Sequence, residues 1–354
     1  MKEKLTVVIL FGGQSSEHDV SCKSAVTIIN SLNTDKYNPV LIGITKEGRW
    51  LLTGFADQIT DGTWRISGTP AILSPDACDQ CVLIWDSGQI RKLPVDVIFP
   101  VLHGMYGEDG TVQGLFELSQ IPYVGCGVLA SAVSMDKLYT KIIVDTLGIR
   151  QARYVGIPVS DLKDMDTVVS NVEAELAYPV FVKPSKSGSS QGVSKAADQK
   201  ELIQALNLAA KHDSKILVEE TIAGREIECA VLGYGSTTQA SGVGEILAAE
   251  AFYSYDAKYN NPQSQTVISP DLPSQTTAKL QEYAVRIFQA VDGFGLSRVD
   301  FFVEHSTGEI VFNEINTLPG FTSISMYPML FRACGLDTDQ LVDELIALAM
   351  ERRK

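Results

Sequence analysis

A loop rich in glycine and serine follows an apolar stretch in the middle of the chain. The stretch YPVFV leads directly into KPSKSGSSQGVSK, residues 183–195. Backbone N–H groups and hydroxyls in such a loop can surround a phosphate, and Lys183 and Lys186 add positive charge. The chain has no G-x-x-x-x-G-K-[ST] motif, so this is not a Walker P-loop. Taken alone, the segment also fits a flexible surface loop.

A second set of polar residues lies in two expected strands nearer the C-terminus. Arg298 and Asp300 lie in SRVDFFV, and Glu314 and Asn316 lie near the end of EIVFNEIN. In a hairpin, side-chain alternation places Glu314 and Asn316 on one face, where Asp300 can join them. Carboxylate and amide oxygens suit Mg²⁺ with bound phosphates rather than zinc. A salt-bridged strand pair would produce the same pattern.

The overall charge narrows the classes of function. The 354 residues include 29 Lys+Arg and 43 Asp+Glu, a formal net charge of −14. This acidity argues against a general nucleic-acid binder, which needs a basic face. An acidic chain that binds a polyphosphate must gather cations, and the candidates are Lys137, Lys183, Lys258 and Arg298. With Mg²⁺ neutralising the carboxylates, the two segments together predict ATP-dependent chemistry.

Two further polar segments follow apolar runs in the first third of the chain. His103 begins HGMYGEDG directly after the run 95–102, and Glu17 lies in FGGQSSEHDVS after the run 5–11. Ligands of open α/β sheets bind at the carboxyl ends of strands, which makes both segments candidate binding loops. The glycines lack the G-x-G-x-x-G spacing of a dinucleotide site.

These segments require elements that position them. Over residues 1–125 apolar runs alternate with helical patterns, which predicts an α/β domain with an open parallel sheet. The pattern changes near residue 126 and again near 223, which indicates α+β units at 126–222 and 223–354. The expected strands are 5–11, 40–44, 95–101, 180–182, 216–218, 226–232, 242–247, 299–303 and 309–313. The expected helices are one capped by Ser21, one carrying Val112, Leu115 and Phe116, and 201–211, 278–291 and 341–350.

Several simple observations concern location and incidental sites. No apolar run approaches the ~18 residues of a membrane span, and the N-terminus fits a first strand better than a signal peptide. Six cysteines without an export signal predict reduced thiols and a cytoplasmic protein with no membrane partner. Cys78 and Cys81 form a lone CxxC, which we interpret as incidental. The histidines expected at the solvated surface are His18, His212 and His305.

In their order along the chain, these segments resemble those of the D-alanine–D-alanine ligases of the ATP-grasp superfamily. The resemblance extends from residue 6 to beyond residue 330. It rests on FGGQSSEHDVS, VDVIFPVLHGMYGEDG, SMDK, KPSKSGSSQGVSK, EETIAGREIECAVLG, FYSYDAKY, SRVD and NEINTLPGFTSISMYP. It implies three domains, with ATP between the sheets of the central and C-terminal ones and a lid over about residues 250–265. It also implies a homodimer and a role in peptidoglycan precursor synthesis.

The resemblance further implies a nucleotide site. Lys137, Lys183 and Ser189 would contact ATP phosphates, and Lys258 would reach the γ-phosphate from the lid. The residues implied around the adenine and ribose are Glu219, Glu226, Phe252 and Phe302. Two Mg²⁺ or Mn²⁺ ions would be bound by Asp300, Glu314 and Asn316.

The substrate site is implied in the same way. Glu17 would pair with the ammonium of the first D-alanine, and His103 would lie near its carboxylate. Arg298 and the Gly320 backbone N–H would form an oxyanion site. Ser189 and Tyr259 would link with Glu17 to orient that ammonium. The second carboxylate would be held by Ser325, with Met326 beside it.

The identity of the second substrate rests on few side chains. By resemblance, Tyr259 after Lys258 and Met326 after Ser325 favour D-alanine over D-serine or D-lactate. A D-Ala–D-Ser or D-Ala–D-Lac ligase is the first alternative. A nucleotide-binding sensor without ligase activity is the second, from a different class. The missing glycine fingerprint counts against a nicotinamide oxidoreductase.

Overall fold

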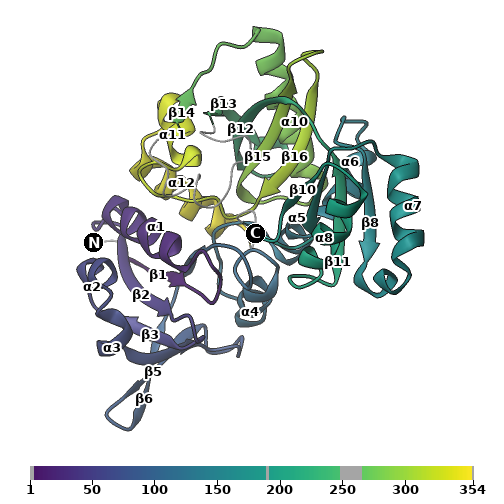
Figure 1. Ribbon diagram of the computed structural model, residues 1–354. Helices are drawn as coiled ribbons and strands as arrows, with labels where there is room; N and C mark the ends of the chain where they lie inside the picture. The colour runs from purple at the N-terminus through teal and green to yellow at the C-terminus, as the bar shows by residue number, and fades with distance from the viewer. Residues whose placement is uncertain (1–3, 189–190, 248–264, 353–354) are drawn as a thin grey trace.

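The computed structural model describes residues 4–188, 191–247 and 265–352. In these ranges the named strands form sheets of seven, four and five strands, which follow one another along the chain (Figure 1). Helices and strands are mixed throughout, and this confirms the predicted α/β class with antiparallel sheets in the later part.

The seven-stranded sheet has the order β6-β5-β4-β3-β2-β1-β7. Its elements are β1 (Leu5–Gly12), α1 (His18–Ser31), β2 (Tyr37–Ile44), β3 (Trp50–Thr53), α2 (Ala56–Asp61), α3 (Trp64–Ser67), β4 (Thr69–Leu73), β5 (Cys81–Asp86), β6 (Gln89–Pro94), β7 (Val97–Leu102) and α4 (Thr111–Ser119). Among the named strands of this sheet, β2, β1 and β7 pair in parallel, whereas β3 to β6 add antiparallel strands that the sequence did not predict. Because β2 and β7 flank β1 on opposite sides, the loops after β1 and β7 meet at a switch point of the sheet.

Helix α1 begins four residues earlier than expected, because its N-cap position is Glu17 and not Ser21. Ser21 is not its cap, because the buried Ser21 hydroxyl accepts the Gly12 N–H at 2.7 Å and donates to the Val101 carbonyl. It therefore joins the helix to β1 and β7. The prediction that His18 is solvated was also wrong. His18 is fully buried, with Nδ1 2.7 Å from the Gly13 carbonyl and its ring stacked on Trp64.

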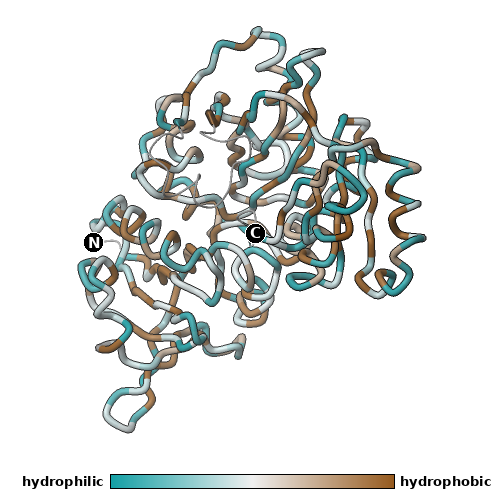
Figure 2. Tube along the Cα trace, in the orientation of Figure 1, coloured by the Kyte–Doolittle hydropathy of each residue, from teal (hydrophilic) through white to brown (hydrophobic). Residues whose placement is uncertain are grey.

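The four-stranded sheet is antiparallel, with the order β10-β9-β11-β8. The elements of this region are α5 (Val128–Met135), α6 (Lys137–Asp145), β8 (Tyr154–Pro158), α7 (Met165–Glu175), β9 (Val180–Pro184), β10 (Ser194–Ala196), α8 (Gln199–Ala209) and β11 (Lys215–Glu220). The apolar sides of α7 and α8 pack on the sheet, and hydrophilic and hydrophobic residues alternate along the outer helix α7 (Figure 2). The glycine-rich loop leaves the end of β9.

The five-stranded sheet has the order β14-β13-β12-β15-β16 and is also antiparallel. Its strands are β12 (Gly224–Gly233), β13 (Gln239–Leu247), β14 (Gln265–Ile268), β15 (Gly295–Glu304) and β16 (Ile310–Asn316), and α10 (Ser274–Ala290) covers one face. Strand β15, which lies between β12 and β16, carries apolar Val299, Phe301 and Val303 toward α10. Strand alternation therefore turns Arg298 and Asp300 to the other face.

The last two helices connect the C-terminal sheet to the first sheet. The helices α11 (Met326–Ala333) and α12 (Thr338–Glu351) share one hydrophobic core with β1, α1 and β7, and lie beside α1 in Figure 1. Phe321, before α11, contacts Phe99 of β7 edge to face with ring centres 6.3 Å apart. The N-terminal sheet is thereby fixed against the segment that follows β16.

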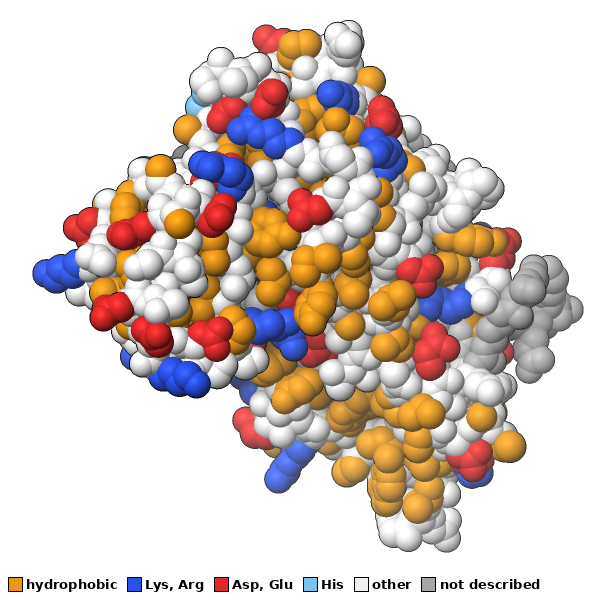
Figure 3. Space-filling model, turned by 90° about the vertical axis from the view of Figure 1, so that its right-hand side faces the viewer, with side chains coloured by type: hydrophobic (Ala, Val, Ile, Leu, Met, Phe, Trp, Pro, Cys, Tyr) orange, Lys and Arg blue, Asp and Glu red, His pale blue; other side chains and the backbone are white. Residues whose placement is uncertain are grey.

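All six cysteines are free thiols, and Cys78 is exposed whereas Cys81 is buried. Among the described residues, no helix combines the length and apolar composition that crossing a bilayer requires. On the face that Figure 3 presents, Lys and Arg side chains are interspersed with Asp and Glu rather than gathered into one basic patch.

Candidate active site

Glu17 lies where three of the predicted binding segments meet. It is half-buried in the loop after β1, directly before α1. A Cβ atom added to Gly104 would lie 2.9 Å from its Oε2 atom, and one added to Gly188 would lie 3.3 Å from it. The Glu17 carboxylate therefore adjoins both HGMYGEDG and the glycine-rich loop after β9.

His103 connects HGMYGEDG to the segment after β16. Its ring is buried, with Nδ1 2.9 Å from the Leu318 carbonyl oxygen and Nε2 3.3 Å from the Ser24 hydroxyl. Both ring nitrogens thus contact the protein in this structure. The ring lies in the substrate region that the sequence indicated, and it also touches the segment that leads to Gly320.

Glu108 is a residue of this region to which the sequence assigned no role. Its carboxylate accepts the backbone N–H of Gly104 at 2.7 Å and that of Leu318 at 3.0 Å. Burial, followed by repulsion from Glu17, raises the pKa of Glu108 to about 8. The signal was the motif HGMYGEDG itself, but a sequence does not reveal which of its two acidic side chains points inward.

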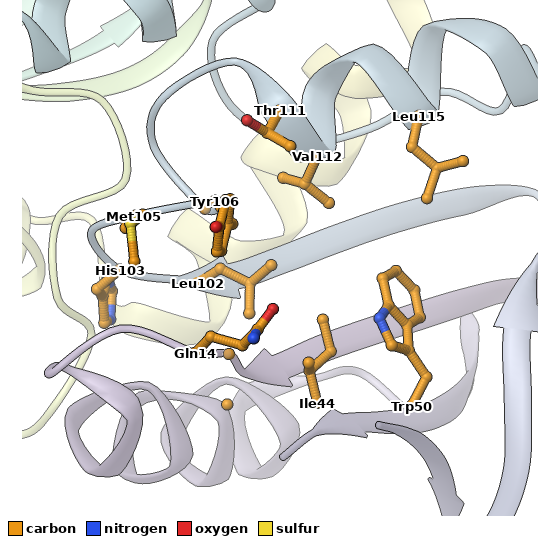
Figure 4. Close-up of a pocket in the computed structure, with 13 residues that line it drawn as sticks. Gln14, Ile44, Trp50, Leu102, His103, Met105, Tyr106, Thr111, Val112 and Leu115 are labelled. Carbon is orange, nitrogen blue, oxygen red and sulfur yellow. The ribbon is translucent and has the colours of Figure 1, made fainter. Parts of the chain in front are cut away.

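A largely apolar cavity of about 280 Å³ opens beside this region (Figure 4). Figure 4 shows Leu102 and Ile44 on its sheet side, Val112 and Leu115 of α4 opposite, and His103 at one end. Among the described residues that line it there is no Asp, Glu, Lys or Arg. It therefore differs in chemistry from the charged region around Glu17.

The central sheet holds a buried cluster of two lysines and one carboxylate. Glu219 of β11 pairs with Lys141 of α6 at 2.6 Å and with Lys183 of β9. Burial alone would raise the pKa of Glu219, but Lys141 and Lys183 lower it to about 2. Burial lowers the pKa of Lys141, whereas the pull of Glu219 outweighs burial and raises that of Lys183. With both lysines protonated, this basic cluster (Lys141, Lys183, Glu219) carries a net charge of +1.

The C-terminal sheet holds the opposite arrangement on the face turned away from α10. Arg298 makes two hydrogen bonds of 2.8 and 2.7 Å to Asp300 and lies 3.1 Å from Glu228. Burial opposes its charge, but Asp300 and Glu228 raise the pKa of Arg298 well above its usual value. This acidic cluster (Glu228, Arg298, Asp300) has a net charge of −1. Register explains it, because Glu228, Asp300 and Glu314 are paired across β12, β15 and β16.

Lys137 joins the glycine-rich loop to the acidic strand β16. Its Nζ donates to the Ser187 carbonyl at 2.8 Å and lies 3.5 Å from Glu314 Oε2. Asn316 donates its side-chain N–H to Asp300 at 3.1 Å. The structure thus brings the predicted residues Lys137, Asp300, Glu314 and Asn316 to one region.

The oxygen set of Asp300, Glu314 and Asn316 has the hard-donor chemistry that suits Mg²⁺. Within the described residues, however, no group of three or more His, Cys, Asp or Glu is arranged to hold a metal ion. Asp300 is engaged by Arg298 and Asn316 instead. The residue types fit the ion, and the metal role stays a prediction.

The other predicted nucleotide residues that the structure describes lie on the same face. Glu226 and Phe302 are paired across β12 and β15 and are both half-buried. Glu226 is close enough to Lys183 to raise the pKa of that ammonium. Ser189, Phe252, Lys258 and Tyr259, and most of the predicted lid, lie outside the described residues.

The predicted substrate residues after β16 form a compact turn. Ser325 Oγ accepts the Thr322 N–H at 3.0 Å, and a Cβ on Gly320 would lie 2.8 Å from that oxygen. Met326 is buried in the core at the start of α11, against Gly244. Ser325 therefore lies beside the Gly320 backbone, while the Met326 side chain packs against β13.

Sequence reasoning missed Lys141 and Glu228 as well as Glu108. Lys141 follows Lys137 by one helical turn, which is a signal that both face one side of α6. Glu228 alternates with Glu226 in REIECAV, so strand periodicity could have placed it on the site face. The sequence did not show which side chains of other elements Lys141 and Glu228 would contact.

Comparisons with known proteins point to one family. Family models described as the D-ala D-ala ligase N-terminus and C-terminus match residues 6–126 and 143–347. A D-alanine–D-alanine ligase of Acetivibrio thermocellus is 50% identical over 99% of this chain and 97% of its own length. That of Clostridium acetobutylicum is 47% identical over 99% of both chains.

Solved structures agree with these relatives. The VanG D-Ala:D-Ser ligase of Enterococcus faecalis superposes with a TM-score of 0.90 at 39% identity, covering 98% of this chain and 100% of that one. The D-alanine–D-alanine ligase of Coxiella burnetii gives 0.83 at 35% identity, covering 99% and 95%.

Proposed function

Because the chain belongs to the D-alanine–D-alanine ligase family, we propose that it joins two D-alanine molecules into D-alanyl-D-alanine and converts ATP to ADP and phosphate. The observation that carries the proposal is the pair of oppositely charged clusters, with Lys137 between them. The basic cluster suits ATP phosphates, and the acidic face suits the cations that accompany them.

The chemistry follows from the weakness of a carboxylate as an electrophile. Transfer of the γ-phosphoryl group to the first D-alanine gives an acyl phosphate, whose phosphate is a good leaving group. The amine of the second D-alanine then attacks the carbonyl carbon and phosphate departs. Lys183, whose pKa is raised by Glu219, keeps its positive charge for the transferring phosphoryl group.

The residues proposed to place the substrates include the Glu17 carboxylate and the Arg298 guanidinium, which both lie close enough to Glu108 to influence its pKa. Glu17, at the junction of the loops that hold Gly104 and Gly188, pairs with the ammonium of the first D-alanine. Arg298 and the Gly320 N–H stabilise the oxyanion that forms when the second amine attacks. Ser325, beside Gly320, holds the carboxylate of the second substrate.

Asp300, Glu314 and Asn316 are the residues that would hold Mg²⁺ or Mn²⁺. When bound, a divalent ion neutralises charge on the phosphates of ATP. Arg298 and Lys137 already lie against two of these carboxylates, and they keep the anionic strands in place before nucleotide binds.

A D-Ala–D-Ser ligase is the second candidate, and one observation favours it. The VanG D-Ala:D-Ser ligase has a TM-score of 0.90 with this chain. The 50% identity to the Acetivibrio thermocellus D-alanine–D-alanine ligase over nearly both full lengths supports D-alanine more strongly. We therefore expect D-alanine as the preferred second substrate.

The test is phosphate release with Mg²⁺-ATP and D-alanine, with the product identified by mass. We expect one D-alanyl-D-alanine for each phosphate. Dipeptide only when D-serine is added would favour the second candidate, and no phosphate release from folded protein would contradict both. We further propose that the product supplies peptidoglycan precursors in the cytoplasm, where ATP is made, and that the protein is a homodimer.

A further inference from the structure

The segment 317–321, which follows β16, is held by hydrogen bonds to residues of the N-terminal sheet region. Leu318 is held on both sides of its backbone, because its N–H donates to Glu108 at 3.0 Å and its carbonyl lies 2.9 Å from His103 Nδ1. Three residues later, the Phe321 N–H donates to the Ser24 hydroxyl at 3.1 Å. The three contacts enclose Gly320.

The hydrogen bonds run in one consistent direction. His103 Nδ1 faces a carbonyl, which only accepts, so Nδ1 carries the proton, and in the neutral ring Nε2 is then an acceptor. Ser24 then donates its hydroxyl proton to Nε2 while it accepts the Phe321 N–H. Ser24 and His103 are both buried, so water does not readily replace these bonds.

Gly320 has little freedom within this arrangement. A side chain there would collide with Ser325, and its two neighbouring contacts, at Leu318 and Phe321, are fixed to another part of the molecule. The direction of the Gly320 N–H is therefore set by residues that are distant in sequence. An oxyanion donor works only when its direction is fixed before charge develops.

We propose that Ser24 and Glu108, together with His103, form a clamp that orients the Gly320 N–H toward the developing oxyanion. This inference rests on the proposed ligase function and adds two positioning residues to it. Glu108 and His103 hold the N–H and the carbonyl of Leu318, two residues before Gly320, and Ser24 holds the Gly320–Phe321 peptide directly after it. The clamp also makes the oxyanion site depend on correct docking of the N-terminal sheet against the segment after β16.

Two matched pairs of variants test the clamp. Ser24→Ala is compared with Ser21→Ala, because Ser21 is an equally buried serine of α1 whose hydroxyl bonds Gly12 and Val101 instead of the segment after β16. Glu108→Gln is compared with Asp109→Asn, because Asp109 accepts the N–H groups of its near neighbours in sequence, Tyr106 and Thr111. kcat, the KM for ATP and the thermal unfolding midpoint are measured for all four.

We expect Ser24→Ala and Glu108→Gln to lower kcat by about 10- to 100-fold relative to their controls, since small misplacements of a catalytic group cost that much. The KM for ATP should stay within about twofold, because the clamp does not touch the nucleotide residues. The double variant should lose less than the product of the single losses, since both residues act on the orientation of the same Gly320 N–H.

Either of two results would overturn the clamp. In the first, each variant lowers kcat no more than its control. In the second, kcat and the KM for ATP worsen together with the unfolding midpoint, as general loosening would cause. If one variant does not fold, the other pair decides. Unmodified protein that forms no dipeptide would instead reject the proposed ligase function, which is a separate outcome.

Discussion

The basic cluster and the acidic cluster have the same arrangement with opposite signs of charge: one ion is shared by two ions of the other sign. In the basic cluster one carboxylate, Glu219, is shared by two lysines, and in the acidic cluster one guanidinium, that of Arg298, is shared by two carboxylates. Every member of the two clusters is buried except Lys183, which is half-buried, so uncompensated charge in either cluster is costly. Each nevertheless keeps one unit in excess.

The opposite signs of the surplus charges indicate which kind of ion each surface attracts. A surplus positive charge on the central sheet attracts phosphate, and a surplus negative charge on the C-terminal sheet attracts a cation. Charge fixed in a poorly solvated region acts more strongly than charge on the surface. On this view, an ion pair in this protein affects function only where its charges do not balance.

We expect the largest effect on turnover from removing a negative charge on β16, beside the acidic cluster. Glu314→Gln keeps the shape and removes a charge from the proposed metal site, so we expect turnover to fall by about two to three orders of magnitude, since a metal contributes several kcal/mol. Phosphate release is measured over a range of Mg²⁺ concentrations. Glu309→Gln, at an exposed residue just before the same strand, is the control. Near-normal turnover in Glu314→Gln would remove the metal assignment.

The basic side should respond more moderately and in a different parameter. Lys141→Met leaves Glu219 with Lys183 alone, which turns a +1 cluster into a neutral pair. We expect the KM for ATP to rise about 10-fold or more, which corresponds to roughly 1.4 kcal/mol, with a smaller change in the KM for D-alanine. Steady-state kinetics at saturating D-alanine measure it. An unchanged KM for ATP would show that surplus charge is not what binds phosphate.

The two clusters also show which parts of the candidate site could be predicted from the sequence. Alternation in SRVDFFV and EIVFNEIN predicted the acidic face, because one strand period relates each pair of residues locally. The glycine-rich loop likewise predicted Lys183. The partners Lys141 and Glu228 come from other elements. The packing of helix α6 brings Lys141 to Glu219, and the register of β12 with β15 brings Glu228 to Arg298. The antiparallel strands β3 to β6 were missed because short, partly polar strands have weak periodicity.

In the N-terminal region too, local sequence predicted where binding loops lie but not which of their side chains are buried. The positions of Glu17 and His103 at strand ends were predictable from the apolar runs before them. The inward turn of Glu108 and the burial of His18 were not, because both depend on contacts with residues far along the chain or on the packing of Trp64. Local pattern identifies binding loops, whereas tertiary contacts decide which of their side chains face inward.

Glu108 belongs to neither cluster, and we expect a smaller effect there, on how the free energy of unfolding depends on pH. Its pKa is about 8 in the folded protein, against 4.5 for an ordinary glutamate. Between these values the folded state binds more protons than the unfolded state, so this group makes the free energy of unfolding fall as pH rises, by at most about 1.4 kcal/mol per pH unit. Denaturant titrations from pH 5 to 8 should show a flatter slope for Glu108→Gln. Equal slopes in both proteins would place the pKa of Glu108 near its ordinary value.

The smallest effect is expected where an ion pair is balanced and exposed. Arg153 pairs one to one with Glu220 at 2.9 Å, and Glu220 is the residue next to Glu219 on β11 but points to the opposite side of the strand. Arg153→Met should change the free energy of unfolding by no more than about 1 kcal/mol, as for other exposed pairs, and leave the KM for ATP unchanged. The same assays used for Lys141→Met measure it. If both variants raised the KM for ATP equally, loss of any cation near β11 would suffice, and the distinction between balanced and surplus charge would be wrong.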